Sequence, residues 1–389
     1  MARELAFVLI NPYPIAKSRT GGIIARYIGR TDLDFVAARM FGPSQELAER
    51  YSALVRNADP ENARNNGLLA DYILTNYAPH PTTGKRRRVM LLLFEGEDAV
   101  RKIWDVTGGA TLKSGSGQTI RDTFGDYIVD QDGNVRYFEP AVMVAPSLKR
   151  AGATLRLWSG YSEADGGIIE SAVDVPEGAE VQKTLVLLKP DSFRFRSSRP
   201  GSIVDLLSSA GLRIVAVKKF HMTVSQAEEF YGPVRDSLRA KFRGIGAARA
   251  AGALSREFGF AVPEEAVYEV CDHIGPFFAA SQFESIVKFM TGYKPSECTE
   301  EEKLTRGTEE CLALVYEGVD AVQKIRNLLG TTDPSKASPG SVRREFGSDI
   351  MVNAAHASDS PESAQRELQI IRVEEDTIRS WIEKHFGHE

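Results

Sequence analysis

Cysteine and long apolar stretches are scarce in this sequence. Cys271, Cys298 and Cys311 are its three cysteines among 389 residues, and none has the spacing of a CxxC pair. This small, odd number of thiols argues against a disulfide-stapled fold and against a cysteine zinc site, and it favours a reducing compartment. No apolar run approaches the ~18 residues that a membrane-spanning helix needs. We therefore expect a protein that does not cross a membrane.

Positive charge is also in deficit. Lys and Arg number 48 against 53 Asp and Glu, so the formal net charge is −5 with neutral histidine, and the isoelectric point is about 5.9. This balance argues against nucleic-acid binding through bulk charge. Near the start, Glu4 precedes a short apolar run that ends at Asn-Pro, a pattern typical of a strand and not of a signal peptide. We expect a cytoplasmic protein with no nucleic-acid partner.

What the sequence does contain is one pattern written twice. Residues 93–125 align without a gap with residues 315–347, and 12 of these 33 positions are identical. Two further pairs of segments correspond upstream: 7–15 with 185–193 and, at a constant offset of 180, 21–51 with 201–231. Internal repetition at this level indicates a tandem duplication. We refer to its halves as the first copy and the second copy.

The length fits two folded units, since a single hydrophobic core stops growing near ~250–300 residues. The segment between the copies is rich in Gly, Ser and acidic residues, as expected of an exposed linker. Apolar residues recur at helical spacing in the tail, which predicts a helix that docks on the body. The expected divisions are 1–160 for the first copy, 161–182 for the linker, 183–373 for the second copy with insertions at 233–275 and 293–310, and 374–389 for the tail.

Both copies show the same predicted order of elements. Each opens with an apolar run that stops at a proline, which marks the end of a strand. In the second copy the pattern continues with a helix over 201–210, strands over 212–220 and 311–318, a helix over 320–329 and a last strand over 349–353. The predicted class is α+β, with two tandem ferredoxin-like (βαββαβ) sandwich domains whose sheets are antiparallel.

Residues suited to phosphate chemistry gather in the second copy. His356 lies between a strand end and the start of a helix, and a histidine near several cations and hydrogen-bond donors is what phosphoryl transfer needs. The candidate partners are Asn353, Ser358 and Glu367 close by in sequence, Lys189 at a strand end, and Thr332 between Arg326 and Arg343. Since a single histidine or arginine is more often structural, the spacing alone leaves that alternative open.

Three segments of the second copy resemble the nucleoside diphosphate kinase family. They are LLKPDSF at 187–193, RNLLGTTDPSKASPGSVRREF at 326–346 and NAAHASDSPESAQRE at 353–367, the last of which carries the family's Asn-x-x-His-x-Ser-Asp-Ser signature. The resemblance covers nearly all of the second copy apart from its insertions. It implies an enzyme that moves the γ-phosphate of a nucleoside triphosphate, usually ATP, to a nucleoside diphosphate by a ping-pong route.

The resemblance also implies a role for each matched residue. His356 would be the nucleophile that becomes phosphorylated, with Glu367 and Ser358 fixing its tautomer and orientation. The nucleotide-binding residues would be Lys189, Arg326, Thr332 and Arg343 at the phosphates, Asn353 at the sugar hydroxyl, Tyr231 beside the histidine and Phe277 against the base, with Phe283 as a rival for that last position. Lys189 would also neutralise charge during transfer. Mg²⁺ would be carried by the nucleotide phosphates, so no protein metal ligands are expected.

The first copy lacks this set of residues. Its aligned positions hold Asn11, Trp104, Ala110, Val144 and Leu155 in place of the lysine, arginine, threonine, histidine and glutamate. Valine cannot attack phosphorus, and without both cations a triphosphate would be poorly held. We expect the first copy to be inactive.

Three questions stay open at the level of sequence. The inactive first copy and the insertions allow an alternative function, a nucleotide-binding scaffold or regulatory protein with little or no turnover. The duplication also allows an internal pseudo-dimer of the two copies, with further homo-oligomerisation on top of it. The third question is the role of the insertions, which would be either solvated helices and loops or a lid or partner surface near the nucleotide.

Overall fold

The computed structural model describes residues 3–58, 60–111, 117–170, 172, 178–305 and 307–387. These fall into two compact units, one made of Met1–Phe220 with Cys311–Glu389 and the other of His221–Glu310. The first unit contains strands from both sequence copies, and the second is built around two long helices. The expected domain boundaries at 160 and 183 stay predictions, because compactness groups the two copies together.

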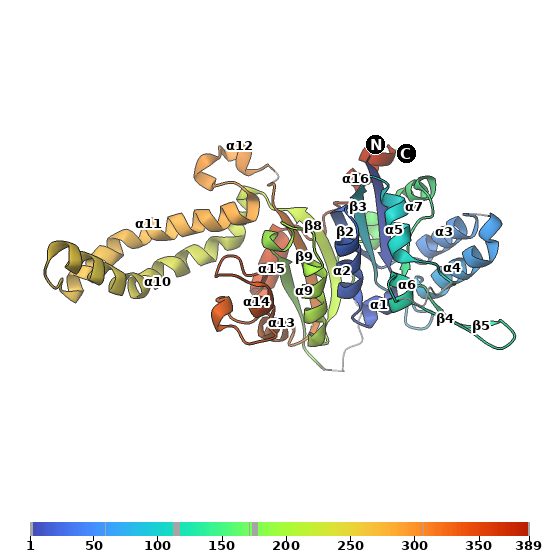
Figure 1. The fold of residues 1–389 in the computed structure, drawn as a ribbon, viewed down its shortest axis with the longest axis horizontal. Coiled ribbons are helices and arrows are strands. Elements are labelled where there is room, and N and C mark those ends of the chain that lie inside the picture. Colours follow the sequence, from blue (N-terminus) through green and yellow to red (C-terminus); the bar gives the residue numbers. More distant parts are fainter. Residues whose placement is uncertain are drawn as a thin grey trace. The chain divides into compact units, whose positions relative to one another are not determined.

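A single eight-stranded sheet runs through the first unit (Figure 1), in the order β10-β7-β9-β8-β2-β3-β1-β6. Its neighbours β1 and β3, and likewise β7 and β9, pair antiparallel. The first copy supplies β1 Glu4–Ile10, β2 Asp34–Phe41, β3 Val89–Gly96 and β6 Val142–Met143, and the second supplies β7 Val181–Leu188, β8 Arg213–His221, β9 Glu310–Val319 and β10 Ala355–Ala357. The predicted α+β class with an antiparallel sheet is confirmed.

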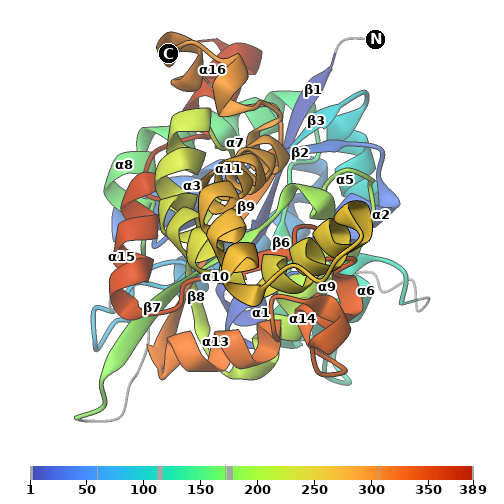
Figure 2. The same cartoon turned by 90° about the vertical axis from the view of Figure 1, so that its left-hand side faces the viewer.

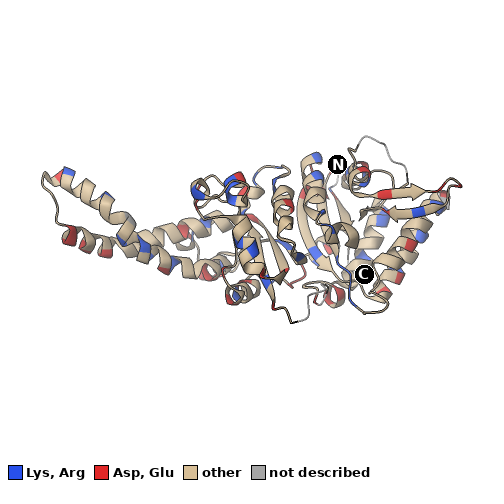
Figure 3. Cartoon of the chain, turned by 90° about the horizontal axis from the view of Figure 1, so that it is seen from below, with Lys and Arg blue, Asp and Glu red and all other residues tan. Residues whose placement is uncertain are grey.

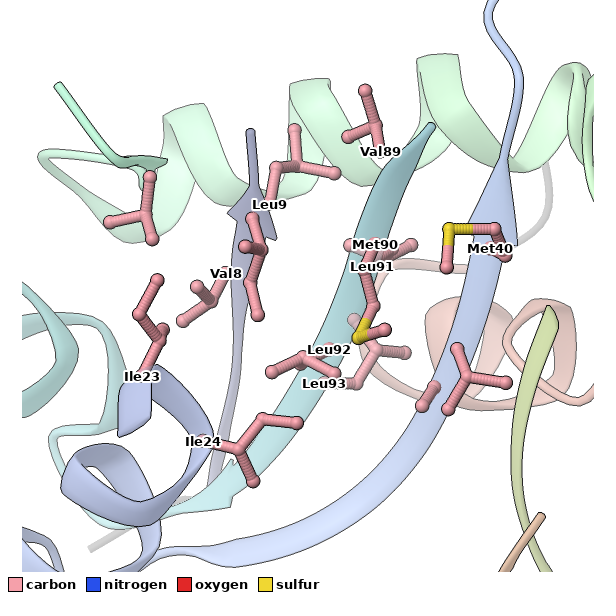
Figure 4. Packing of buried hydrophobic residues seen from close by; sticks show 14 of the residues in the cluster. Val8, Leu9, Ile23, Ile24, Met40, Val89, Met90, Leu91, Leu92 and Leu93 are labelled. Atoms are coloured by element: carbon pink, nitrogen blue, oxygen red, sulfur yellow. The ribbon is translucent and has the colours of Figure 1, made fainter. Parts of the chain in front are cut away.

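The core of this unit forms where continuous apolar strands meet amphipathic helices. All eight residues of β3 are buried, and so are the last six of β1. Figure 4 shows Leu9 of β1, Leu91 of β3 and Met40 of β2 packed together, with Ile23 and Ile24 of α2 (Thr20–Arg30) on the same cluster. Because both faces of these central strands are covered, the strands read in sequence as unbroken hydrophobic runs.

Helices and one small hairpin complete the first unit (Figures 1 and 2). In the first copy the remaining elements are α1 Pro12–Ala16, α3 Gln45–Arg56, α4 Ala63–Asn76, α5 Ala99–Thr107, α6 Ile120–Phe124, α7 Leu148–Gly160, α8 Ser162–Asp165 and the two-stranded sheet of β4 Asp126–Val129 and β5 Val135–Glu139. In the second copy they are α9 Arg199–Leu207, α13 Ala321–Leu329, α14 Val342–Phe346 and α15 Pro361–Ile370, and in the tail α16 Arg379–Phe386. Serine side chains cap α3, α7 and α15, which fixes where these helices begin.

The predicted last strand over 349–353 is wrong. That stretch forms a turn, because Asp349 Oδ1 accepts the backbone N–H groups of Met351 and Val352 at 2.7 and 2.8 Å. An aspartate that bonds the backbone two and three residues ahead competes with strand pairing. The strand starts later, at β10, where Ala355 pairs with Leu188 of β7.

Two glycines let the copies approach each other closely. Helices α2 and α9 pack together, one from each copy. A Cβ atom on Gly201 would lie 2.3 Å from the backbone nitrogen of Ala25 and 2.4 Å from the carbonyl oxygen of Gly21. A Cβ on Gly21 would lie 2.3 Å from the nitrogen of Asp205. Only residues without a side chain fit at this contact.

The copies also meet at the sheet, where β2 and β8 pair antiparallel with Arg39 opposite Lys218. These equivalent residues are 218 − 39 = 179 apart, one fewer than the constant offset of 180 predicted from the sequence. The reason is a one-residue difference in the turn before the strand, since Leu33 contacts Gly96 as Leu212 contacts Gly318.

Backbone carbonyls compensate these two buried cations. Arg39 donates to the carbonyl of Ser162 and to those of Glu374 and Glu375. Lys218 donates to the carbonyls of Ile371 and Arg372 and to the carboxylate of Glu375. Burial lowers the pKa of both cations. The segments that follow α7 and α15 are thereby tied to the centre of the sheet.

The tail returns to the first copy. Ile378 and Ile382 are buried, and α16 packs against α7 and β1. Lys384 Nζ and His385 Nε2 each lie 2.8 Å from Glu95 Oε1 on β3. The hydrogen bonds from these two side chains and from Arg3 hold the pKa of the Glu95 carboxyl near 2, although burial opposes this. The last helix therefore joins the end of the second copy to the sheet of the first.

The second unit is a helical hairpin. Helix α10 (Val224–Phe258) begins with a capping box at Thr223 and packs along α11 (Glu264–Thr291); a short helix, α12 (Glu300–Lys303), follows. The rings of Phe242 and Phe278 stack between the two long helices, with their centroids 4.5 Å apart. Lys and Arg recur along α10 from Arg235 to Arg256, whereas Asp and Glu predominate on α11 (Figure 3). Among the described residues, no helix is both long and apolar enough to span a bilayer.

The close contact at Gly201 predicts a large effect of a small change. Gly201→Ala adds one methyl group where backbone atoms already stand, so we expect the free energy of unfolding to fall by ~1–3 kcal/mol. Chemical denaturation of the whole chain measures this. The matched control is Gly160→Ala in α7, where a Cβ meets nothing within 4 Å, and this variant should keep or gain up to ~1 kcal/mol. Equal stability of the two variants would contradict the tight contact.

Candidate functional site

His356 lies on β10, opposite Leu187 of β7. Its Nε2 atom is 3.0 and 3.1 Å from the two carboxylate oxygens of Glu367, and the Ser358 hydroxyl donates to Glu367 Oε2 at 2.7 Å. Glu367 is on α15, which starts at a serine cap followed by proline. The cap fixes the helix frame, so Glu367 points back at the strand that carries the histidine. These three predicted residues are brought together.

The contact with Glu367 bears on the tautomer of the neutral imidazole. Glu367 is buried, whereas the side chain of His356 keeps 25% of its surface exposed. A carboxylate that accepts from Nε2 requires the proton on that nitrogen, which leaves the lone pair on Nδ1. In a neutral ring of this tautomer, Nδ1 is the nitrogen that can attack an electrophile.

Lys189, Asn353 and Thr332 form a second linked group. Lys189 follows β7 directly, and its Nζ donates to Asn353 Oδ1 at 3.0 Å and to the carbonyl of Met351. The Asn353 amide donates to the Thr332 carbonyl at 3.1 Å. Burial of the ammonium lowers the pKa of Lys189 to about 8. The group places one cation, held by neutral oxygens, beside the start of β10.

Arg343 reaches the histidine strand from α14. It donates to the carbonyl of Gly330 at 2.9 Å and to that of Ala355 at 3.2 Å. In the first copy Arg121 makes the same two bonds, to Gly108 at 2.9 Å and to Val142 at 3.1 Å. Both copies therefore share an arginine that joins these two backbone segments. In the second copy, this bond holds the Arg343 guanidinium at the carbonyl of the residue before His356.

Arg326 approaches from α13 and is exposed. The pKa of Asp359 is lowered mainly by a hydrogen bond from Ser363, and the charges of Arg326 and His356 add to this effect. Arg326 therefore lies within electrostatic reach of the loop after β10. Asp359 belongs to the signature segment but was not among the predicted site residues.

Tyr231 and Phe277 belong to the helical unit. Tyr231 is on α10, with its ring 4.9 Å from that of Phe230. Phe277 is on α11 and 78% exposed, whereas its rival Phe283 is buried. Their roles beside the histidine and against a base stay predictions, because the helical unit is separate from the unit that holds His356.

One buried carboxylate near the histidine, that of Asp191, was not predicted from the sequence. Asp191 Oδ2 accepts the backbone N–H of Ala354 at 3.2 Å and a hydrogen bond from Arg199. Ala354 has a left-handed conformation with φ 71° and stands two residues before His356. Asp191 belongs to the Lys-Pro-Asp sequence of the first matched segment, and this was the one sign that it lies near the site. The sequence does not show which backbone group the aspartate binds.

In the first copy, the strand register corrects two predicted equivalences. Leu9 pairs with Met143 as Leu187 pairs with His356, so Met143 occupies the histidine position and the prediction of Val144 is wrong. The capping serines Ser147 and Ser360 align α7 with α15 and put Thr154, not Leu155, at the glutamate position. Both predicted positions are off by one residue. The β4–β5 hairpin has no counterpart among the described residues of the second copy, so the sequence match is interrupted and the alignment after it is shifted.

A closed network fills the interior of the first copy at the position of Lys189. The Tyr77 hydroxyl donates to Asn11 Oδ1 at 2.7 Å, and the Asn11 amide donates to Glu139 Oε1 at 3.1 Å. The Tyr72 hydroxyl donates to Glu139 Oε2 at 2.6 Å. All four residues are buried, and Trp158 packs edge-on against Tyr77 with ring centroids 6.1 Å apart. Buried aromatic rings therefore surround this position in the first copy.

Comparison with known proteins places the second copy in a family. The family model described as nucleoside diphosphate kinase matches residues 182–246 and 300–377. A nucleoside diphosphate kinase of Campylobacter hominis is 30% identical over 188 residues, which cover 48% of this chain and 93% of that protein. The chain belongs to the nucleoside diphosphate kinase family. The resemblance seen in the three sequence segments is thereby confirmed.

Further relatives give the same coverage. A nucleoside diphosphate kinase of Helicobacter pylori is 29% identical over 187 residues, or 48% of this chain and 92% of that protein. The crystal structure of the Aquifex aeolicus nucleoside diphosphate kinase has 30% identity over 49% of this chain and 95% of that chain, with a TM-score of 0.31. The family model leaves out residues 247–299, so its match does not reach Phe277.

The depressed pKa of Lys189 predicts how binding depends on pH. A lysine holds phosphate only while it is protonated, and burial brings its pKa down to about 8. The dissociation constant of ADP should therefore be nearly constant between pH 6.5 and 7.5 and should rise above pH 8 by up to about ten-fold per pH unit. Isothermal titration calorimetry across this range measures it.

Two variants complete this test. Lys189→Met should bind weakly at every pH, with no rise above pH 8. Lys102→Met changes a cation of the first copy that pairs with Asp32, and it should keep the wild-type profile. A wild-type dissociation constant that stays flat up to pH 9.5 would show that Lys189 is not the phosphate cation.

Proposed function

We propose that this protein is a nucleoside diphosphate kinase whose second copy transfers the γ-phosphate of a nucleoside triphosphate, ATP in the usual case, to a nucleoside diphosphate through a phosphohistidine at His356. The observation that carries the proposal is the contact of His356 Nε2 with the buried carboxylate of Glu367, at 3.0 Å. It leaves Nδ1 as the nucleophile. The names of the relatives support the same substrates.

Transfer would proceed in two displacements. Nδ1 attacks the γ-phosphorus, the bond to the bridging oxygen breaks, and the diphosphate leaves with the electron pair. A second diphosphate then takes the phosphoryl group back from Nδ1. The Nε2 proton stays with the ring throughout, because Glu367 offsets the positive charge that the phosphorylated imidazole carries.

Cations of the chain would hold the phosphates. Lys189, Arg343 and Arg326 approach β10 from three elements, with Thr332 and Asn353 between them as polar groups. Such a set suits an anionic nucleotide and not a bare metal ion, and among the described residues no group of three or more His, Cys, Asp or Glu could hold one. Mg²⁺ bound to the nucleotide phosphates would neutralise further charge there.

The first copy would act as an inactive partner in an internal pseudo-dimer of two ferredoxin-like domains. The strand order supports this, since β10-β7-β9-β8 of the second copy is mirrored by β2-β3-β1-β6 of the first. The contact at Gly21 and Gly201 supports it too. Cytoplasmic location and further self-association stay predictions.

Labelling tests the proposed enzyme directly. Incubation with γ-labelled ATP should give an acid-labile phosphoprotein, and His356→Gln should abolish the label because the nucleophile is gone. His80→Gln, which changes an exposed histidine of the first copy, should keep it. Retention of the full label by His356→Gln would refute the mechanism. Normal nucleotide affinity with turnover no better than His356→Gln would favour the scaffold alternative.

Glu367 should affect turnover more than binding. Glu367→Ala removes the group that holds the Nε2 proton and offsets charge, so we expect kcat to fall about 100-fold or more while KM changes little. The control is Glu362→Ala, an exposed glutamate in the first turn of the same helix. Steady-state assays decide, and similar kcat values for both variants would contradict the role.

A further inference from the structure

Both copies contain an alanine in the left-handed region just before their last strand. Ala141 has φ 61° and precedes β6, and Ala354 has φ 71° and precedes β10. Residues with a Cβ avoid this region because of contacts with the backbone. The surroundings must therefore hold these alanines in place. In the second copy the constrained residue is two positions from His356.

The same two hydrogen bonds hold each alanine. The Ala141 carbonyl accepts the N–H of Asn11 at 3.0 Å, and the Ala354 carbonyl accepts that of Lys189 at 2.9 Å. The alanine N–H donates to a buried carboxylate, to Glu139 Oε1 at 2.9 Å in the first copy and to Asp191 Oδ2 at 3.2 Å in the second.

The carboxylates come from unrelated positions. Glu139 stands two residues before its alanine, at the end of β5, whereas Asp191 stands two residues after Lys189, beyond the end of β7. In the first copy the position of Asp191 is taken by Tyr13, according to the alignment of 7–15 with 185–193. The same backbone bond thus arises from two different side chains, which indicates that the turn depends on it.

Asp191 connects more than this turn. Arg199, which donates to the same oxygen, also donates to the carbonyl of Phe346 at the end of α14, at 2.7 Å. The Ser192 hydroxyl donates to the Ala354 carbonyl at 3.3 Å. Burial raises the pKa of Asp191, and the charges of Arg199 and Lys189 counteract this rise. One carboxylate therefore links the end of β7, α14 and the start of β10.

We propose that Asp191 is a positioning residue, which accepts the Ala354 N–H and so fixes the left-handed turn that places His356 relative to Lys189. It acts through the backbone, and no contact with the nucleotide is assigned to it. The kinetic part of the test rests on the proposed function.

The test compares variants that keep or remove the acceptor. Asp191→Ala should lower kcat by roughly 10–100-fold, since a displacement of about 1 Å at a reacting group has effects of this size. KM should change by less than about three-fold at pH 6.5, where Lys189 stays protonated in all variants. Asp191→Asn keeps an oxygen acceptor and should stay within about three-fold of wild-type kcat.

Glycine should rescue the loss. Ala354→Gly in the Asp191→Ala background supplies a residue that adopts positive φ without a Cβ clash. The kcat of this double variant should therefore be at least about five-fold higher than that of Asp191→Ala. The matched control is Glu139→Ala, alone and with Ala141→Gly. Glu139→Ala removes the equivalent bond in the first copy, so it should lower the denaturation midpoint but leave kcat unchanged. Adding Ala141→Gly should raise the midpoint again.

Three results would overturn the proposal. The first is wild-type kcat in folded Asp191→Ala. The second is a loss in Asp191→Asn equal to that in Asp191→Ala without rescue by glycine, which would assign the effect to the charge. The third applies if Asp191→Ala does not fold: Ala354→Gly must then restore folding, and a failure to do so contradicts the proposal.

Failure of the enzyme itself is distinguishable from failure of this inference. If wild-type protein has no turnover, the proposed function fails. Amide hydrogen exchange over 353–357 still tests the turn, because exchange should be faster in Asp191→Ala and slower again after Ala354→Gly. Unchanged exchange in Asp191→Ala would contradict the role of Asp191 whatever the activity.

Discussion

The contact between α2 and α9, and the pairing of β2 with β8 beside it, constrain the rest of the sheet-containing unit. Gly21 and Gly201 leave no room for a side chain at the helix contact. At the sheet, Arg39 lies opposite Lys218, and two like charges on facing positions would repel. Carbonyls after α7 and α15 accept their N–H groups. Because α15 carries Glu367, the joining of the two copies also anchors the helix that orients His356.

One backbone design supports two different interiors. Arg121 and Arg343 make equivalent bonds to backbone carbonyls, and Ala141 and Ala354 take the same left-handed conformation. The difference lies in the side chains that face inward. The first copy buries an aromatic and amide network that closes on itself, whereas the second buries an ammonium among carbonyl oxygens and leaves the imidazole partly exposed. The first copy is thus closed by neutral groups and one carboxylate, whereas the second holds a buried cation near a partly exposed histidine.

The sequence predicted the duplication, the α+β class and the histidine group, because these depend on local patterns such as apolar runs, capping serines and a signature of eight positions. It failed where a side chain bonds the backbone or where an inserted hairpin shifts the alignment. Asp349 turned the predicted last strand into a loop, and the β4–β5 hairpin shifted the first-copy equivalences from Met143 and Thr154 by one residue. The role of Asp191 was also invisible, since a bond from a backbone N–H leaves no mark on residue spacing.

Under the proposed function, the second copy binds nucleotide and the first copy, whose interior is filled by a buried hydrogen-bonded network, does not. Calorimetric titration of the whole chain with ADP and Mg²⁺ measures the number of sites. We expect one site per chain, which is lost in Lys189→Met and kept in Asn11→Ala. Two sites per chain, or a single site that survives Lys189→Met, would contradict it.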